Sequence, residues 1–199
     1  MRRQLLIVVQ GGFLLGALAA LVLLLTVDAG PPRIEGSGKA LIGGPFALID
    51  QNGKTVTDRD FAGRYTLVFF GFTHCPDICP AELQVMTAAL DQLGDKADKV
   101  VPIFITLDPE RDTPQIVGDY VRNFSPRLVG LTGSAEAVAG AARAYRVIYA
   151  KVEDPSSANG YSVDHSALVY LMGPNGDYLE HFAYGTSAAT MAETLRRYL

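Results

Sequence analysis

Cysteine and positive charge are both scarce in this chain. Only two cysteines, Cys75 and Cys79, occur among the 199 residues, so no disulfide framework of the kind found in small secreted proteins can form. Lys and Arg number 17 against 21 Asp and Glu, a net charge of -4, so the basic surface that nucleic-acid binding requires is missing. We therefore expect no nucleic-acid partner. Charged residues make up 19% and hydrophobic residues 49%, which excludes collagen-like, coiled-coil and wholly disordered chains.

The apolar excess is concentrated near the start of the chain. Residues 5–27 contain no charged side chain, and at about 1.5 Å per residue they are long enough to cross a bilayer. This run is longer than the apolar region of a cleavable signal peptide, although Val27-Asp28-Ala29 resembles a weak cleavage site. Arg2 and Arg3 precede it, which favours a cytoplasmic position for residues 1–4. We predict a single-pass anchor in a bacterial inner membrane, with the soluble part in the periplasm.

The rest of the chain divides into a tether and one domain. Residues 28–44 are rich in Gly and Pro and lack periodicity, as is typical of a flexible tether. Between 45 and 199, apolar runs alternate with helical patterns, which predicts a three-layer α/β sandwich with a mixed sheet. We expect a hairpin at 46–57, strands at 65–72, 100–107, 127–131, 147–152, 166–172 and 178–183, helices at 81–93, 113–124, 134–145 and 187–199, and a polar loop at 153–162.

The two cysteines lie between a predicted strand and a predicted helix. On a first helical turn, the four-residue spacing of Cys75 and Cys79 would bring their Cβ atoms within about 5–6 Å on one face. Both sulfurs can then reach one metal ion, since thiolate–metal bonds are about 2.3 Å long. The start of a helix also lowers cysteine pKa values, because its dipole stabilises the thiolate. The pair therefore suits metal or redox chemistry; the alternative is a disulfide that only staples the loop.

Two thiolates leave a metal ion under-coordinated, so a third ligand is expected from one of the three histidines. His74 and His181 are expected to be structural or exposed. His165 follows a polar loop and directly precedes an apolar strand, so it can face a neighbouring strand–loop–helix junction. Asp164 is a candidate for orienting the imidazole, and Asp77 for modulating the thiolates between which it lies.

Three sequence blocks resemble the signature blocks of the Sco/SenC copper proteins. They are GFTHCPDICP at 71–80, TLDPERDTP at 106–114 and VDHS at 163–166, and the resemblance extends from Pro45 to Leu199. In the second block, we expect Asp108, Arg111 and Asp112 to be structural residues that organise the turn before a helix.

The resemblance implies a thioredoxin-like fold and one copper ion, Cu(I) or Cu(II), bound by Cys75, Cys79 and His165. It also implies a membrane-anchored metallochaperone that delivers copper to, or maintains the thiols of, the binuclear copper centre of cytochrome c oxidase. The expected partners are the copper-bearing subunit of the oxidase, a copper donor protein and a periplasmic dithiol reductant. Thiolate ligands favour Cu(I), while imidazole also permits Cu(II) or zinc.

The main rival function is that of a thioredoxin-like thiol–disulfide oxidoreductase, in which Cys75 and Cys79 form a redox-active pair or disulfide. Three residues separate the cysteines instead of the two of a thioredoxin-type dithiol, and the segment around His165 lacks the proline usual in that superfamily. A thiol peroxidase is disfavoured because Phe72 stands where a peroxiredoxin would have Thr or Ser. A third alternative is a membrane-tethered interaction module whose cysteines only staple a loop.

Overall fold

The computed structural model describes residues 41–199, apart from residues 156, 158 and 159. Three predicted features lie outside these residues: the cytoplasmic segment 1–4, the membrane span 5–27 and most of the tether 28–44. Within the described residues, no helix has both the length and the apolar character that crossing a membrane requires. Two of the last tether residues contact the domain: the Gly43 N–H donates to the Ala144 carbonyl (2.9 Å), and Arg146 Nε donates to the Leu41 carbonyl (3.3 Å).

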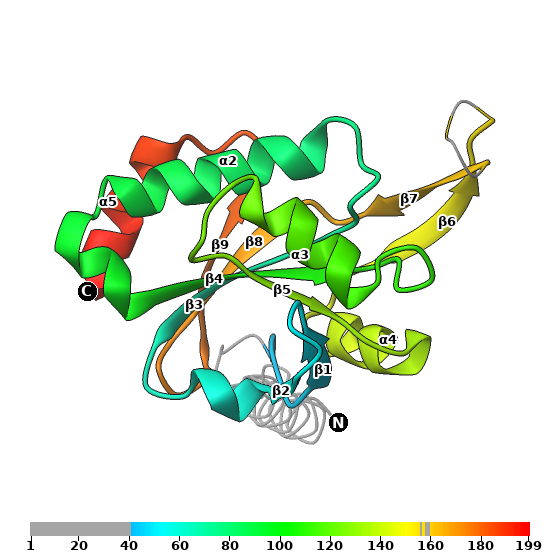
Figure 1. The fold of residues 1–199 in the computed structure, drawn as a ribbon. Coiled ribbons are helices and arrows are strands. Elements are labelled where there is room, and N and C mark those ends of the chain that lie inside the picture. The colour runs from blue at the N-terminus through cyan, green and yellow to red at the C-terminus, as the bar shows by residue number, and fades with distance from the viewer. Residues whose placement is uncertain (1–40, 156, 158–159) are drawn as a thin grey trace, which may run out of the picture. The chain divides into compact units, whose positions relative to one another are not determined.

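A seven-stranded mixed sheet in the order β2-β1-β5-β4-β3-β8-β9 forms the centre of this region (Figure 1). Its middle strands, β3 (Tyr65–Gly71) and β4 (Val100–Thr106), run parallel, and all their residues except Tyr65 are buried. Apolar strands of this kind need cover on both faces. The other strands are β1 (Ala47–Asp50), β2 (Thr55–Thr57), β5 (Val129–Thr132), β8 (Leu168–Met172) and β9 (Tyr178–Ala183).

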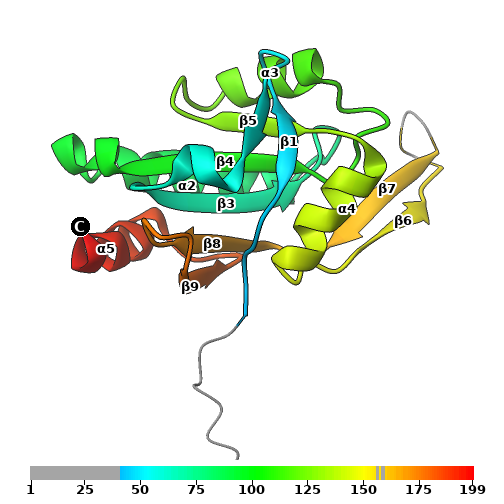
Figure 2. The ribbon, with the colours of Figure 1, turned by 90° about the horizontal axis from the view of Figure 1, so that it is seen from below.

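Helices cover both faces of the sheet. The helices α2 (Ile78–Asp91), α3 (Pro114–Arg122) and α5 (Ala188–Tyr198) lie on one side, and α4 (Ala135–Ala144) lies on the other (Figures 1 and 2). Aromatic packing follows the strand alternation: the Phe104 ring meets Tyr120 of α3 at 5.4 Å, and the Phe70 ring meets Tyr145 after α4 at 5.3 Å. The predicted three-layer α/β sandwich with a mixed sheet is confirmed.

The helix starts predicted from capping residues are also confirmed. Thr113, Ser134 and Ser187 each accept a hydrogen bond at their side-chain oxygen from a backbone N–H of the first helical turn, which satisfies a donor without an intrahelical partner. Helix α2 begins earlier than predicted, at Ile78 instead of Ala81, so Cys79 lies within its first turn.

The strand β7 (Tyr161–His165) corrects the prediction for the segment before His165. It pairs antiparallel with β6 (Tyr149–Glu153) in a separate two-stranded sheet, and this β6–β7 hairpin projects from the main sheet in Figure 1. The end of the expected polar loop 153–162 is therefore part of a strand. His165 ends β7, and two residues separate it from the start of β8, so it does not directly precede an apolar strand.

Candidate metal centre

The two cysteines occupy the connection from β3 to α2. Cys75 is half-buried in the loop, whereas Cys79 is fully buried in the first turn of α2. The Cys79 N–H donates to Cys75 Sγ at 3.3 Å, which draws the loop sulfur toward the start of the helix. The expected placement of both sulfurs on one helical turn is thus close to what the structure contains. Both cysteines are free thiols.

The β6–β7 hairpin brings His165 to this loop. Its Nε2 lies 3.5 Å from Cys79 Sγ, although 86 residues separate them in the chain. Its Nδ1 lies 3.1 Å from the Ser166 carbonyl oxygen, which can only accept, so Nδ1 is the donor and the Nε2 lone pair faces the sulfur. The rings of Phe69 and Phe72 meet the imidazole edge-on at 6.0 and 6.1 Å and fix its plane.

The sulfur–nitrogen distance suits two ligands of one ion. A thiolate at about 2.3 Å and an imidazole at about 2.05 Å from an ion, at a tetrahedral angle, lie about 3.6 Å apart. The distance of 3.5 Å between Cys79 Sγ and His165 Nε2 agrees with this value. In the region that the structure describes, no set of three His, Cys, Asp or Glu side chains is already closed around one point. Enclosing an ion therefore requires a side-chain adjustment, and half-buried Cys75 is the member with room to make it.

The two thiols have opposite pKa shifts. The pKa of Cys75 is lowered to about 4, first by the hydrogen bond from the Cys79 thiol and further by the backbone N–H groups of Cys79 and Asp77, against the effect of burial. The pKa of Cys79 is raised because its proton is held by the Cys75 sulfur and because it is buried. The reduced pair therefore shares one proton, with Cys75 as the thiolate at neutral pH.

A cavity of about 320 Å³ opens over these groups. Cys75 and His165 line it, and Asp77 and Asp164 stand at its exposed rim. The Nδ1 partner of His165 is the carbonyl of Ser166 and not Asp164, which was expected to orient the imidazole. Asp77, which was expected to modulate the thiolates, lowers the pKa of Cys75 through its backbone N–H.

The other two histidines make their contacts elsewhere. His74 Nδ1 lies 3.1 Å from Thr73 Oγ1 and 3.7 Å from Asp112, and the ring is 38% exposed. His181 Nδ1 lies 2.5 Å from the Tyr178 hydroxyl on the exposed face of β9. Both positions agree with the structural or exposed roles expected for them.

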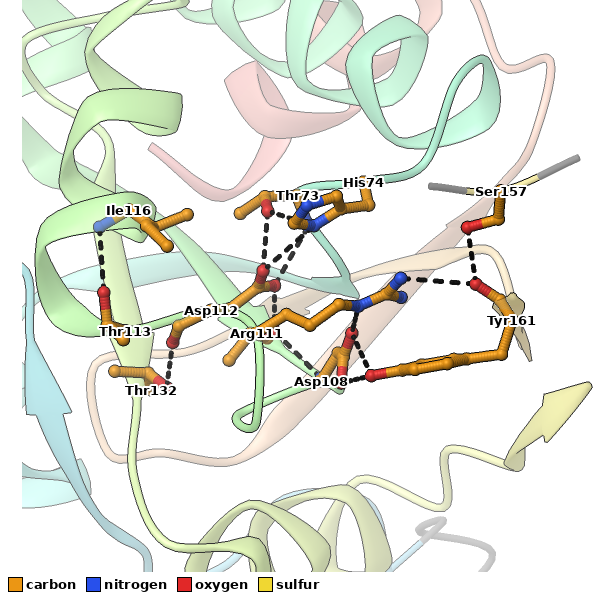
Figure 3. A network of polar contacts seen from close by, with 11 residues as sticks. Thr73, His74, Asp108, Arg111, Asp112, Thr113, Ile116, Thr132, Ser157 and Tyr161 are labelled. Carbon is orange, nitrogen blue, oxygen red and sulfur yellow. Dashed lines mark hydrogen bonds and ion pairs between the residues drawn. The ribbon is translucent and has the colours of Figure 1, made fainter. Parts of the chain in front are cut away.

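The turn at 108–112 does more than organise the start of α3 (Figure 3). The buried Asp112 carboxylate accepts from the Thr73 N–H (3.0 Å), from the Thr73 hydroxyl (2.6 Å) and from the Thr106 hydroxyl (2.5 Å), so it holds the entrance of the cysteine loop against the end of β4. Asp108 and Arg111 contact Tyr161 at the start of β7. Sequence reasoning missed Tyr161; the alternation of Tyr161, Val163 and His165 with Ser162 and Asp164 was the available signal of a strand.

The model of the family described as SCO1/SenC matches residues 34–199. The chain belongs to the SCO1/SenC family. "Protein SCO1 homolog 1, mitochondrial" of Arabidopsis thaliana is 50% identical over 147 residues, which cover 73% of this chain and 43% of that protein. The chain spans about half the length of the curated SCO1 relatives from plant, mouse and human that it matches.

Two solved structures place the fold within the same family. The structure of Bradyrhizobium japonicum ScoI with copper bound is 46% identical, with a TM-score of 0.73, and the match covers 79% of this chain and 99% of that chain. BsSco, described as a member of the Sco family of cytochrome c oxidase assembly proteins with a disulfide switch, is 25% identical. Its TM-score is 0.63, and the match covers 80% of this chain and 93% of that chain. The thioredoxin-like fold implied by the sequence blocks agrees with these SCO1/SenC structures.

Proposed function

We propose that this SCO1/SenC protein is a metallochaperone that binds copper and takes part in assembling cytochrome c oxidase. The copper-bound state of the Bradyrhizobium relative and the description of BsSco as an oxidase assembly protein support this proposal. In the proposed function, Cys75, Cys79 and His165 hold the copper ion, and this ion is delivered to the binuclear copper centre of the oxidase. The observation that carries the proposal is the approach of His165 Nε2, with its lone pair directed at Cys79 Sγ, to within 3.5 Å.

The donor set suits an ion that is bound and then passed on. Two thiolates favour Cu(I), and one imidazole keeps Cu(II) accessible in the same pocket. Cys75 offers a thiolate before the metal arrives, whereas Cys79 must lose its proton on binding. Cys75 and His165 line the open cavity, so the thiols of a recipient can approach the ion by that route and replace the ligands one at a time.

Copper titration of the soluble domain tests the ligand set. The variants are Cys75→Ser, Cys79→Ser and His165→Ala, with His181→Ala as the matched control because His181 lies on the exposed face of β9. We expect each ligand variant to weaken Cu(I) binding in competition with a chromogenic chelator, and the control to match the wild type. Unchanged copper affinity in His165→Ala would remove the third ligand from the proposal.

Thiol–disulfide exchange is the second candidate function. It is favoured by the pairing of a Cys75 thiolate with a neighbouring thiol, because this arrangement can attack a disulfide and then release the product. When a disulfide of a partner accepts the electrons, oxidation of Cys75 and Cys79 to a disulfide removes two electrons and the one shared proton, and it also removes both thiolate ligands. Maintaining the oxidase thiols and delivering copper therefore draw on the same reduced pair.

The cellular setting completes the proposal. The apolar run 5–27 serves as an uncleaved anchor in a bacterial inner membrane, with the copper-binding domain in the periplasm. Because that compartment is oxidising, a periplasmic dithiol reductant must keep the pair reduced before a copper donor protein loads it. A measured reduction potential for Cys75–Cys79 tests this need: a potential high enough for the pair to stay reduced without help would contradict it.

A further inference from the structure

We propose that Arg111 and Tyr161 are positioning residues that set the distance between His165 and the two cysteines. This inference rests on the proposed function, because it assigns His165 to the copper site. It concerns residues that touch neither the ion nor the ligand atoms. They act through the β6–β7 hairpin, whose last residue is His165.

The hairpin needs such a support. In the part of the chain that the structure describes, β6 and β7 pair only with each other and add no strand to the seven-stranded sheet. The cysteines, in contrast, are attached to the main sheet through β3 and α2. His165 is also joined to β8 of the main sheet by a two-residue connection. The position of the imidazole relative to the sulfurs therefore depends on this connection together with side-chain contacts between two separately hydrogen-bonded parts of the domain.

Arg111 provides the principal contact. Its side chain is 8% exposed, its Nε donates to the Asp108 carboxylate, and its Nη1 donates to the Tyr161 carbonyl oxygen at 3.2 Å (Figure 3). The guanidinium carbon also lies 3.8 Å from the centre of the Tyr161 ring, in cation–π geometry. One planar group thus fixes the backbone and the ring of the residue that begins β7.

The Tyr161 hydroxyl completes the clamp by donating to Asp108 Oδ1 at 2.9 Å. The Asp108 carboxylate is fully buried, so losing its bond to the guanidinium or to the phenol would leave a buried charge without a partner, which costs free energy. Asp108, Arg111 and Tyr161 therefore form one closed set of contacts that joins β7 to the turn after β4.

The same turn also holds the sulfur side of the site. Asp112 binds the N–H and hydroxyl of Thr73, two residues before Cys75. The Phe72 ring lies between the two sides: its centre is 5.9 Å from the Arg111 guanidinium carbon and 6.1 Å from the His165 ring. The turn at 108–112 is thus a common reference to which both halves of the copper site are attached.

Arginine is required here for its shape as well as for its charge. Its Nη2 is buried with no hydrogen-bond partner among the described residues, which opposes folding. An apolar side chain would avoid this penalty, and a lysine would keep the charge next to Asp108. An apolar side chain has no donor for the Asp108 carboxylate and the Tyr161 carbonyl. A lysine would have to make both bonds from a single nitrogen, without the planar group that lies over the Tyr161 ring.

A double-mutant cycle on the soluble domain tests the proposal. The variant Arg111→Lys is combined with His165→Ala, and Cu(I) affinity is measured by chelator competition. Arg122→Lys is the matched control, since Arg122 forms an exposed ion pair with Asp119 on α3. Loss of a group hydrogen-bonded to a metal ligand typically weakens binding about 10–100-fold. Arg111 acts through β7 and not on the ligand itself, so we expect a loss of about tenfold, the lower end of this range, from Arg111→Lys alone. We expect no loss from Arg122→Lys and a change within twofold when Arg111→Lys is added to His165→Ala.

An equal loss in both backgrounds would show that Arg111 acts independently of His165 and would overturn the proposal. If Arg111→Lys fails to fold, Tyr161→Phe replaces it in the same double-mutant cycle. This variant loses only the hydroxyl that donates a hydrogen bond to Asp108. It is expected to weaken copper binding less than Arg111→Lys, and again only when His165 is present.

A second readout needs no copper and so separates this proposal from the proposed function. In the reduced apo-protein, nuclear Overhauser effects between the His165 ring and the Phe69 and Phe72 rings report the position of the imidazole. We expect these effects in the wild type and in Arg122→Lys, and their weakening or loss in Arg111→Lys. If they remain unchanged in Arg111→Lys, the positioning role is wrong. If they weaken while the wild type binds no copper, the proposed function alone is wrong.

Discussion

At the scale of single residues, Cys75 and Cys79 differ in burial and in pKa although they are only four residues apart. Cys79 is fully buried with its sulfur close to Gly71, while Cys75 lines the cavity. The four-residue spacing was sufficient to predict that the sulfurs meet. It could not predict which sulfur keeps the proton, because that depends on burial and on hydrogen bonds formed only in the folded chain.

The lowered pKa of Cys75 predicts unusual pH behaviour. With a pKa of about 4, Cys75 is almost entirely a thiolate above pH 6, so its alkylation by iodoacetamide should change little between pH 6 and 8. An ordinary thiol, with a pKa of about 8.5, slows almost tenfold per pH unit over this range. Mass spectrometry of the singly labelled, reduced protein measures the rates.

Cys79→Ala is the informative comparison for this prediction. It removes the thiol that contributes most to the shift, so the pKa of Cys75 should rise and its alkylation should become pH-dependent. A wild-type rate that already falls tenfold from pH 8 to pH 7 would show that Cys75 is not the thiolate of the pair.

The close approach of Gly71 to Cys79 predicts that a larger side chain at position 71 would clash with the cysteine sulfur. A Cβ at this position would lie 2.8 Å from Cys79 Sγ and 3.1 Å from carbons of the Phe69 and Phe104 rings, so Gly71→Ala must displace the sulfur. We expect the free energy of unfolding to fall by about 1–3 kcal/mol, as for other overpacked cores. Urea denaturation measures it.

The control for Gly71→Ala is Gly140→Ala in α4, where a Cβ would meet no atom closer than 3.9 Å. This substitution should stabilise the protein by up to about 1 kcal/mol, because alanine is the better helix former. Equal stability of the two variants would contradict the close approach of Gly71 to Cys79.

At the scale of elements, the site is a junction of three segments: the β3–α2 loop, the turn after β4 and the end of β7. Sequence patterns predicted the first from its cysteines and the second as a turn before α3. The strand β7 escaped prediction because the segment is short and polar, and only Val163 within it is fully buried. The mutual contacts of these segments link residues far apart in the chain, so local propensity carries no information about them.

The buried Asp112 carboxylate joins the β3–α2 loop to the turn after β4, which predicts the effect of replacing it. Asp112→Asn keeps the volume but removes the charge and replaces one acceptor oxygen by an NH₂ group, so the hydrogen bonds to Thr73 and Thr106 are weakened. We expect the free energy of unfolding to fall by about 1–3 kcal/mol. Hydrogen–deuterium exchange should become faster at the N–H of Thr73 and in the cysteine loop.

Asp119→Asn provides the comparison for this prediction, because Asp119 is exposed on α3. It should leave the exchange of the cysteine loop unchanged. If Asp112→Asn also leaves the N–H of Thr73 fully protected, the carboxylate does not anchor the loop.

At the scale of the whole molecule, the copper-binding domain is proposed to work from a membrane anchor. The described residues 41–199 contain the predicted sandwich, and the SCO1/SenC match extends over 34–199. The anchor at 5–27 and its orientation remain predictions from hydropathy and from Arg2 and Arg3. Such patterns report how a segment partitions into a bilayer, whereas the proposed copper site depends on tertiary contacts that they do not contain.

Deletion of the gene tests whether copper delivery or thiol maintenance is the main role in the cell. We expect the copper content of the oxidase to fall in the deletion strain, since no other step of the proposal supplies the ion. If copper delivery is the main role, added copper should restore the copper content of the oxidase. If thiol maintenance is the main role, an added dithiol reductant should restore it. Metal analysis of the purified oxidase measures the outcome, and normal oxidase assembly in the deletion strain would contradict the pathway.

X-ray absorption spectroscopy of the copper-loaded domain tests the central claim most directly, because it identifies the atoms around the ion. The account predicts a shell of sulfur neighbours together with the outer scattering of one imidazole, and the loss of that imidazole signal in His165→Ala. An all-sulfur environment in the wild type, or an imidazole signal that persists in His165→Ala, would contradict it.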